Sequence, residues 1–171
     1  GVVTGSTRGS VIKNLAVHYE VRVNPVWPMP GMEEALAHFR AEKMPMSIIS
    51  NAQFFTPLLF PALLDQPLDS LGFIEEACVW SYQLRRGKPS LGLYETAAEY
   101  FESKLAIKPD QILYVGNDMY NDIYPAAHIG FKTALFAGDK RSLRLREDKE
   151  ECRDITPDLT LTALDQLKDC V

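Results

Sequence analysis

The sequence predicts an α/β fold built on a doubly wound parallel sheet, because short apolar runs alternate with amphipathic helices along most of its 171 residues. The apolar runs are of strand length, and most of them end in Ser, Asn or Gly. Strands and helices that alternate at this rhythm favour parallel pairing with right-handed crossovers. The predicted strands are residues 46–50, 78–80, 111–115, 132–136 and 158–161.

Amphipathic periodicity predicts the helices between these strands. In the first of them, residues 10–23, the apolar side chains fall on one helical stripe, and Ser10 is predicted as its N-cap. Pro25, Pro28 and Pro30 then form a stiff connector, because proline fixes its own backbone and disfavours helix before it. The remaining predicted helices are residues 32–42, 56–64, 90–105, 124–129 and 163–168.

Composition and charge narrow the class of protein. The net charge is -5 at pH 7 and the pI is about 5.2, which gives no general attraction to nucleic acid or anionic membranes. Three widely spaced cysteines form no CxxC pair, which favours a reducing, cytoplasmic compartment. No apolar run approaches the roughly 18 residues of a membrane span. We therefore expect a cytoplasmic protein with a small-molecule substrate.

Polar residues follow the predicted strands at the edge where parallel sheets bind ligands. A hydroxyl and backbone N–H groups can bind phosphoryl oxygens, and a lysine neutralises developing negative charge. Carboxylates hold hard cations such as Mg²⁺. These groups together outline a phosphate and divalent-cation site, and the residues that supply them are Ser50, Asn51, Lys88, Asn117, Asp118 and Asp122.

Each of these residues also has an ordinary structural explanation. Ser50 and Asn51 are common in turns, and Lys88 before Pro89 is typical of a solvated turn. Asp118 and Asp122 flank the start of a helix, where the helix dipole favours acidic residues without any metal. Their order along the chain is what favours a functional interpretation.

That order resembles the haloacid dehalogenase-like hydrolases. Ser-Asn after one strand, Gly-Lys-Pro at 87–89 and Val-Gly-Asn-Asp-Met-Tyr-Asn-Asp at 115–122 are similar to motifs two, three and four of that superfamily. The segment 126–133 is similar to the one that follows the fourth motif, and the resemblance runs from about Pro28 onward. It implies a Rossmann-like core at 28–171 that lacks its first strand, preceded at 1–27 by a helical cap remnant and connector.

The resemblance also implies roles for the site residues. Members of the superfamily attack with an aspartate from an Asp-x-Asp motif after the first strand, and in the phosphatases Mg²⁺ bridges this group and acids of the fourth motif. Asn117 stands where an Asp is usual, which should weaken Mg²⁺ binding. The implied roles are catalytic for Lys88 and Ser50, substrate-binding for Ser50 and Asn51, and metal-binding for Asp118, Asp122 and Asn117.

The nucleophilic aspartate has no counterpart in the sequence before Asp65, which is its first Asp. One hypothesis is a Mg²⁺-dependent phosphatase for a small phosphorylated metabolite, inactive or incomplete as this chain. The alternative is a catalytically silent relative that acts as a binding or scaffold module. A central strand exchanged between two copies would make a homodimer.

The charged stretch 139–155, with its basic run 140–146, is predicted as an exposed loop or interface element.

Overall fold

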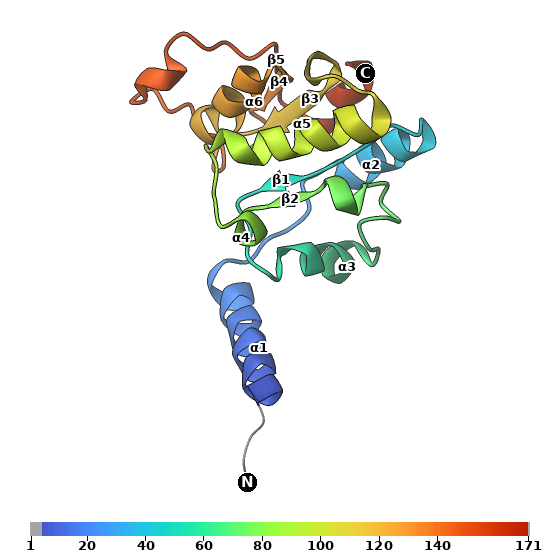
Figure 1. Cartoon of the computed structure of the whole chain (residues 1–171), viewed down its shortest axis with the longest axis vertical. Helices are drawn as coiled ribbons and strands as arrows, with labels where there is room; N and C mark the ends of the chain where they lie inside the picture. The colour runs from blue at the N-terminus through green and yellow to red at the C-terminus, as the bar shows by residue number, and fades with distance from the viewer. Residues whose placement is uncertain (1–4, 171) are drawn as a thin grey trace.

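The computed structural model describes residues 5–170, which form five parallel strands and a set of helices arranged around them (Figure 1). The strands are β1 (Ile49–Ser50), β2 (Val79–Trp80), β3 (Leu113–Gly116), β4 (Lys132–Phe136) and β5 (Leu159–Leu161). The α-helices are α1 (Gly5–Val23), α2 (Met32–Ala41), α3 (Leu59–Leu64), α4 (Ser81–Leu84), α5 (Leu91–Leu105) and α6 (Tyr124–Ile129). The π-helix η4 (Met119–Ile123) runs directly into α6, and short 3-10 helices are η1 (Thr56–Leu58), η2 (Glu75–Ala77), η3 (Pro109–Gln111), η5 (Glu150–Cys152) and η6 (Leu164–Asp169).

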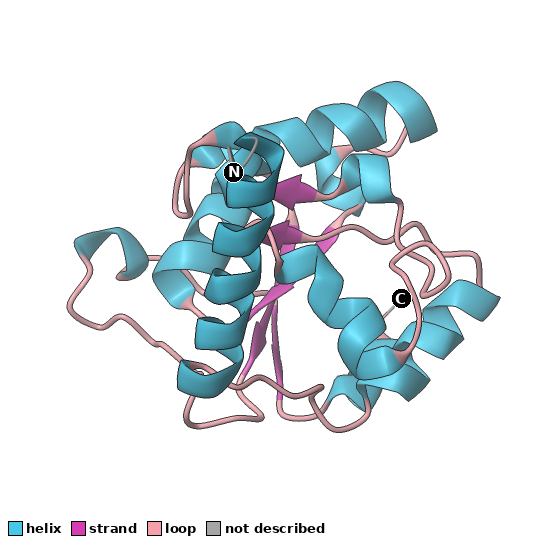
Figure 2. Ribbon diagram, turned by 90° about the horizontal axis from the view of Figure 1, so that it is seen from below, coloured by secondary structure: helices cyan, strands magenta, loops and turns pink. Residues whose placement is uncertain are grey.

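Helices cover both faces of the strands, so the predicted doubly wound α/β fold is confirmed (Figure 2). On one face, α5 packs against β1 and β2 through Leu93 and Tyr94, and α6 packs against α5 and β4 through Ala126. On the other face, α2 and η6 pack against β4 and β5 through Phe39 and Leu167. Burial on both faces explains why β2 and β4 are apolar runs without alternation.

The parallel strands fall into two separate ladders. β1 pairs with β2, and β3, β4 and β5 pair in that order, but β1 and β3 share no ladder. The Tyr114 hydroxyl of β3 reaches across to the carbonyl oxygen of Ile49 in β1, at 3.4 Å. Within the described residues, the Tyr114 side chain therefore links the two ladders. The assignment of 1–27 and 28–171 as separate units stays a prediction.

Strand β1 is shorter than the apolar run 46–50 predicts. Only Ile49 and Ser50 pair with β2, while Met46 makes an isolated parallel bridge with Phe73. The Ser47 hydroxyl donates to the carbonyl oxygen of Ala77, which replaces a ladder contact at this point.

One prediction about a helix end is wrong. α1 begins at Gly5, so Ser10 lies inside the helix and is not its N-cap, because helical hydrogen bonding continues upstream of it. The last predicted helix, residues 163–168, is confirmed as the 3-10 helix η6. It is short, and the Gln166 side chain accepts the backbone N–H groups of Thr162 and Ala163 at its start.

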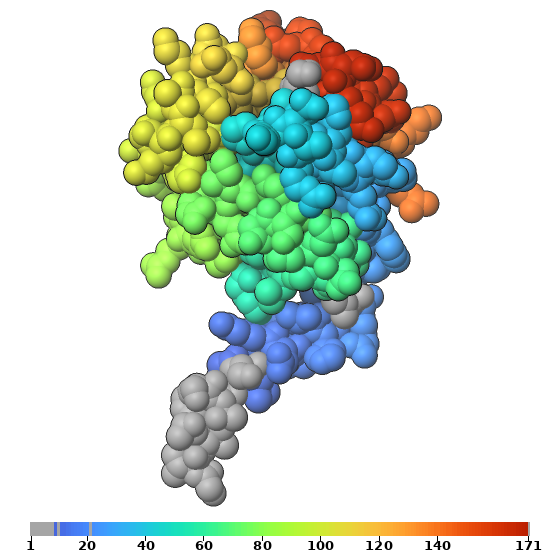
Figure 3. Space-filling view, turned by 90° about the vertical axis from the view of Figure 1, so that its right-hand side faces the viewer, coloured from blue at the N-terminus to red at the C-terminus, as the bar shows by residue number. Residues whose placement is uncertain are grey.

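α1 extends away from the rest of the molecule (Figures 1 and 3). Its apolar stripe is therefore exposed, with Leu15 and Ile12 about two thirds accessible to solvent (68% and 66%). Within the described residues, no helix is long and apolar enough to cross a membrane.

Candidate functional site

An open pocket of about 420 Å³ lies at the carboxyl ends of β1 and β3. This is the edge where ligands bind in open parallel sheets. All six residues predicted from the sequence line it, together with four that the sequence reasoning did not assign to a site. The lining residues are Ser50, Asn51, Lys88, Asn117, Asp118, Asn121, Asp122, Ser142, Arg144 and Arg146.

Lys88 is held in the pocket by its ammonium group. Lys88 Nζ lies 2.8 Å from Oδ1 of Asp122 and 2.7 Å from the Tyr114 hydroxyl. The side chains of the ion pair are only 12% (Lys88) and 7% (Asp122) exposed. Lys88 is thus a nearly buried cation with a fixed position, not the solvated turn lysine of the ordinary interpretation.

Asn51 fixes the main chain at Lys88. Its Oδ1 accepts the backbone N–H of Lys88 at 2.7 Å, and its Nδ2 donates to the Lys88 carbonyl oxygen at 3.5 Å. The Asn51 amide is therefore occupied in joining the end of β1 to the turn before α5. The structure shows Asn51 as a residue that positions Lys88, and its predicted contact with substrate stays a prediction.

Asp122 is positioned by the turn that follows β3. Its Oδ2 accepts the backbone N–H groups of Asn117 and Asp118, both at 3.0 Å. This geometry needs glycine at position 116, because a Cβ there would lie 2.3 Å from Cβ of Asp122. The Gly116 that ends the predicted strand thus has a steric role in the site.

Asp118 caps the start of η4. Its Oδ1 accepts the backbone N–H groups of Tyr120 (3.0 Å) and Asn121 (3.1 Å), and its Oδ2 accepts Nδ2 of Asn121 at 2.9 Å. Burial raises the pKa of Asp118, but hydrogen bonds from Arg146, Asn121 and Tyr120 outweigh it and leave the pKa below its ordinary value. Asp118 is therefore ionised over the whole neutral range.

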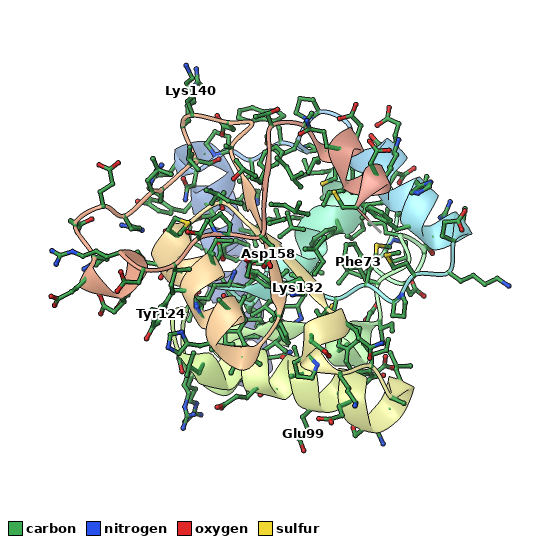
Figure 4. All side chains as sticks on the ribbon, turned by 90° about the horizontal axis from the view of Figure 1, so that it is seen from above. Phe73, Glu99, Tyr124, Lys132, Lys140 and Asp158 are labelled. Carbon is green, nitrogen blue, oxygen red and sulfur yellow. The ribbon has the colours of Figure 1, made fainter. Side chains whose placement is uncertain are left out.

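The charged stretch 139–155 is not simply an exposed loop, and that prediction is wrong in part. Lys140 points outward (Figure 4), but Arg144 and Arg146 line the pocket. Leu143 and Cys152 pack against η4, which draws the stretch onto the core. The sequence analysis missed this because a run of basic residues followed by acids has the composition of a solvated loop. The alternation of Arg with Leu at 143–146 was the available signal.

Tyr114 is a second group that the sequence analysis missed. It was counted as one more residue of a buried strand, but its hydroxyl contacts both Lys88 and Asp122, the latter at 3.2 Å. The Tyr94 hydroxyl lies 3.4 Å from it and donates to the carbonyl oxygen of Asn121 at 2.6 Å. Burial raises the pKa of Tyr114 well above its ordinary value, so its hydroxyl stays protonated.

The carboxylates of Asp118 and Asp122 are fully engaged by hydrogen bonds. Every carboxylate oxygen of Asp118 and Asp122 already accepts at least two hydrogen bonds. Asn117 lines the same pocket, and its Nδ2 donates to the carbonyl oxygen of Ser142 at 2.6 Å. Across residues 5–170, no group of three or more His, Cys, Asp or Glu side chains could hold a metal ion. Mg²⁺ at these residues stays a prediction.

Comparison with known proteins shows the fold and a family resemblance in the C-terminal half of the chain. A family model described as HAD-hydrolase-like, HAD being haloacid dehalogenase, matches residues 85–167, which contain Lys88 and the segment 115–122. A search of curated proteins found no match.

Solved structures of similar fold include both phosphatases and dehalogenases. A predicted phosphoglycolate phosphatase from Haemophilus somnus 129PT has a TM-score of 0.68 at 19% identity, with 99% of this chain and 69% of that chain covered. The L-2-haloacid dehalogenase from Xanthobacter autotrophicus, with chloropropionic acid covalently bound, has a TM-score of 0.65 at 19% identity, with 96% and 70% covered.

A HAD phosphatase from Thermococcus onnurineus has a TM-score of 0.60 at 16% identity, and 83% of this chain is covered. The chain spans 57% of the length of that phosphatase. The parallel α/β core agrees with the fold of these neighbours. The chain is therefore similar to the haloacid dehalogenase-like hydrolases over residues 85–167, and it shares its fold with solved phosphatases and dehalogenases.

Proposed function

We propose that the protein is a hydrolase whose pocket receives the phosphoryl group of a small phosphorylated metabolite. The position of Lys88 carries this proposal. Its ammonium group is nearly buried and fixed at the carboxyl end of the sheet, where Ser50 lines the same pocket. A preorganised cation beside a hydroxyl stabilises negative charge on phosphoryl oxygens more strongly than a solvated lysine does.

The neighbouring residues either hold the Lys88 side chain and main chain in place or meet the substrate. Asp122 and the Tyr114 hydroxyl hold the ammonium of Lys88, and Asn51 holds its main chain. The Ser50 hydroxyl would donate a hydrogen bond to a phosphoryl oxygen. Arg144 is exposed at the rim, where it would attract an anionic substrate.

Neither Asp118 nor Asp122 is suited to act as the nucleophile. Both carboxylates are paired with cations and hydrogen-bonded on both oxygens, so neither has the freedom of a nucleophile. Residues 1–64 contain no Asp. We therefore expect the 171-residue chain to bind a phosphoryl anion but to hydrolyse p-nitrophenyl phosphate at a negligible rate.

A second candidate is a catalytically silent anion-binding module. The pairing of both pocket carboxylates with cations favours it, because no acid in the described pocket is left to act as a base. The coding sequence upstream of Gly1 separates the two candidates. An apolar strand followed by Asp-x-Asp supports the hydrolase, and an open reading frame that begins near Gly1 supports the silent module.

Isothermal titration with inorganic phosphate tests the proposed pocket. We expect saturable binding to the wild-type chain and loss of that binding in Lys88→Met. Lys104→Met, an exposed lysine in the last turn of α5, is the matched control and should bind as the wild type does. Equal binding by the wild type and Lys88→Met would refute the proposal, as would absence of binding to the folded wild type.

A further inference from the structure

The loop after β4 returns to the site as an extension of the sheet edge. The backbone N–H of Arg144 donates to the carbonyl oxygen of Asn117 at 2.9 Å, and the backbone N–H of Met119 donates to the carbonyl oxygen of Arg144 at 2.8 Å. These bonds form a parallel bridge between Asp118 and Arg144. The main chain thereby carries Arg146 to the face of Asp118.

Arg146 binds Asp118 with two arms of its guanidinium. Its Nη2 lies 2.6 Å from Oδ2 of Asp118, and its Nε lies 3.0 Å from Oδ1 and 3.1 Å from Oδ2. The side chains are 34% (Arg146) and 11% (Asp118) exposed. This two-armed geometry is the strong form of an arginine–carboxylate contact, and both residues line the pocket.

A divalent cation would need the same edge of the same carboxylate. Mg²⁺ takes oxygen ligands at about 2.1 Å in near-octahedral geometry, and those oxygens cannot at the same time accept hydrogen bonds along the metal direction. Arg146 already donates to both oxygens of Asp118, and Lys88 donates to Oδ1 of Asp122.

The charge of the pocket points the same way. Its lining includes three cationic side chains, those of Lys88, Arg144 and Arg146, and two carboxylates, those of Asp118 and Asp122. The excess of positive charge favours a small anion and opposes the entry of a divalent cation.

We propose that Arg146 is the resident counter-cation of Asp118 and that it excludes Mg²⁺ from the acidic residues, so that the pocket accepts a small anion without a metal ion. This inference deepens the proposed function and rests on it for the anion. The exclusion of Mg²⁺ itself rests only on the contacts of Arg146 and Lys88 with the two carboxylates.

Mg²⁺ titration by calorimetry tests the exclusion without any need for turnover. The wild type should show no saturable Mg²⁺ binding, whereas Arg146→Gln should bind Mg²⁺ at least about tenfold more tightly, because one positive charge leaves the carboxylate. Arg146→Met gives the same test with an apolar side chain of similar length, and Arg146→Lys should still exclude the ion. Arg144→Gln is the matched control, since Arg144 Nη1 donates to backbone carbonyl oxygens and not to Asp118.

Two results would overturn the inference. One is saturable Mg²⁺ binding by the wild type that Asp118→Asn abolishes. The other is an Arg146→Gln or Arg146→Met variant that is folded, by its near-ultraviolet circular dichroism, and gains no Mg²⁺ affinity. Neither result depends on phosphate binding, so a failure here is distinguishable from a failure of the proposed function.

Discussion

Lys88 and Asp122 lie 34 positions apart in the chain, and the structure joins them in an ion pair of 2.8 Å inside the pocket. The turn before α5 supplies the lysine, and η4 after β3 supplies the carboxylate. The two residues come from opposite sides of the boundary between the β1-β2 and β3-β4-β5 ladders. The pair thus links the two halves of the core as well as the two halves of the site.

Lys88→Met should lower the free energy of unfolding by about 3 kcal/mol, because it leaves the Asp122 carboxylate buried without its counter-charge. Lys132→Met is the control. Its partner Asp158 lies 3.8 Å away, both side chains are largely exposed, and Figure 4 shows the two residues close together. An exposed pair contributes at most about 1 kcal/mol. Urea denaturation of both variants measures the difference, and similar losses would show that Lys88 and Asp122 are not coupled as described.

Gly116→Ala should move Asp122 and destabilise the protein, because the new methyl group would overlap the Asp122 side chain. We expect a loss of stability of about 2 kcal/mol together with loss of phosphate binding. Gly9→Ala is the matched control, since nothing lies within 4 Å of a methyl group at that position of α1. An unchanged thermal midpoint and unchanged phosphate affinity in Gly116→Ala would contradict the packing described here.

Tyr114→Phe should cost about 1 kcal/mol, because the hydroxyl that links Lys88, Asp122 and the Ile49 carbonyl oxygen is lost. The exposed Tyr19 gives the control, Tyr19→Phe, which should be neutral. Chemical denaturation of the two variants measures the cost. A neutral Tyr114→Phe would remove the hydroxyl from the account of the site.

The stability of the fold at alkaline pH should depend on Tyr94 and Tyr114. Burial raises the pKa of both Tyr94 and Tyr114 above the ordinary value of 10.0. A raised pKa means that the folded protein retains protons that the unfolded chain releases, so this contribution is complete below pH 10 and is lost as the pH rises above it. In an ultraviolet titration, these two of the seven tyrosines should ionise only on unfolding. Ionisation of all seven in the folded protein near pH 10 would contradict their burial.

The stability of the fold at acid pH should depend on Asp118. Its pKa in the folded protein lies below the ordinary 3.8, so the unfolded chain binds a proton on this carboxyl at a pH where the folded protein does not. The contribution is therefore complete well above pH 4 and is lost as the pH falls through the folded value. Asp118→Asn should show a shallower decline of unfolding free energy below pH 4. Identical acid transitions in the two proteins would mean that Arg146 does not hold the carboxylate in solution.

Much of the fold follows from local pattern. Apolar runs of strand length define β3 and β4 closely, and four of the five residues of β4 are buried, as expected of a strand covered on both faces. The length of β1 does not follow from its sequence, since the Ser47 hydroxyl contacts a backbone carbonyl of a distant segment. The start of α1 was also misplaced, because a serine inside a helix has the same local sequence as a serine that caps one.

The site residues that stand in motifs after strands were predictable from the sequence. The residues that a loop brings to the pocket were not. Lys88 and Asp122 stand in motifs whose order along the chain is informative. Arg146 reaches the pocket because the backbone of Arg144 pairs beside Asp118, and this long-range pairing is not encoded in the local sequence around Arg146. The Tyr114 hydroxyl was hidden for a different reason, since a tyrosine in an apolar strand looks like any other buried aromatic residue.

The central claim is that a phosphoryl anion binds at the carboxyl ends of β1 and β3. Two-dimensional ¹H–¹⁵N NMR of the 171-residue chain during titration with inorganic phosphate tests it most directly. We predict saturable shifts concentrated on the backbone amides of Ser50, Lys88 and residues 117–122. Shifts concentrated instead around Lys140 on the outer part of the loop, or no saturable shift in the folded protein, would contradict the claim.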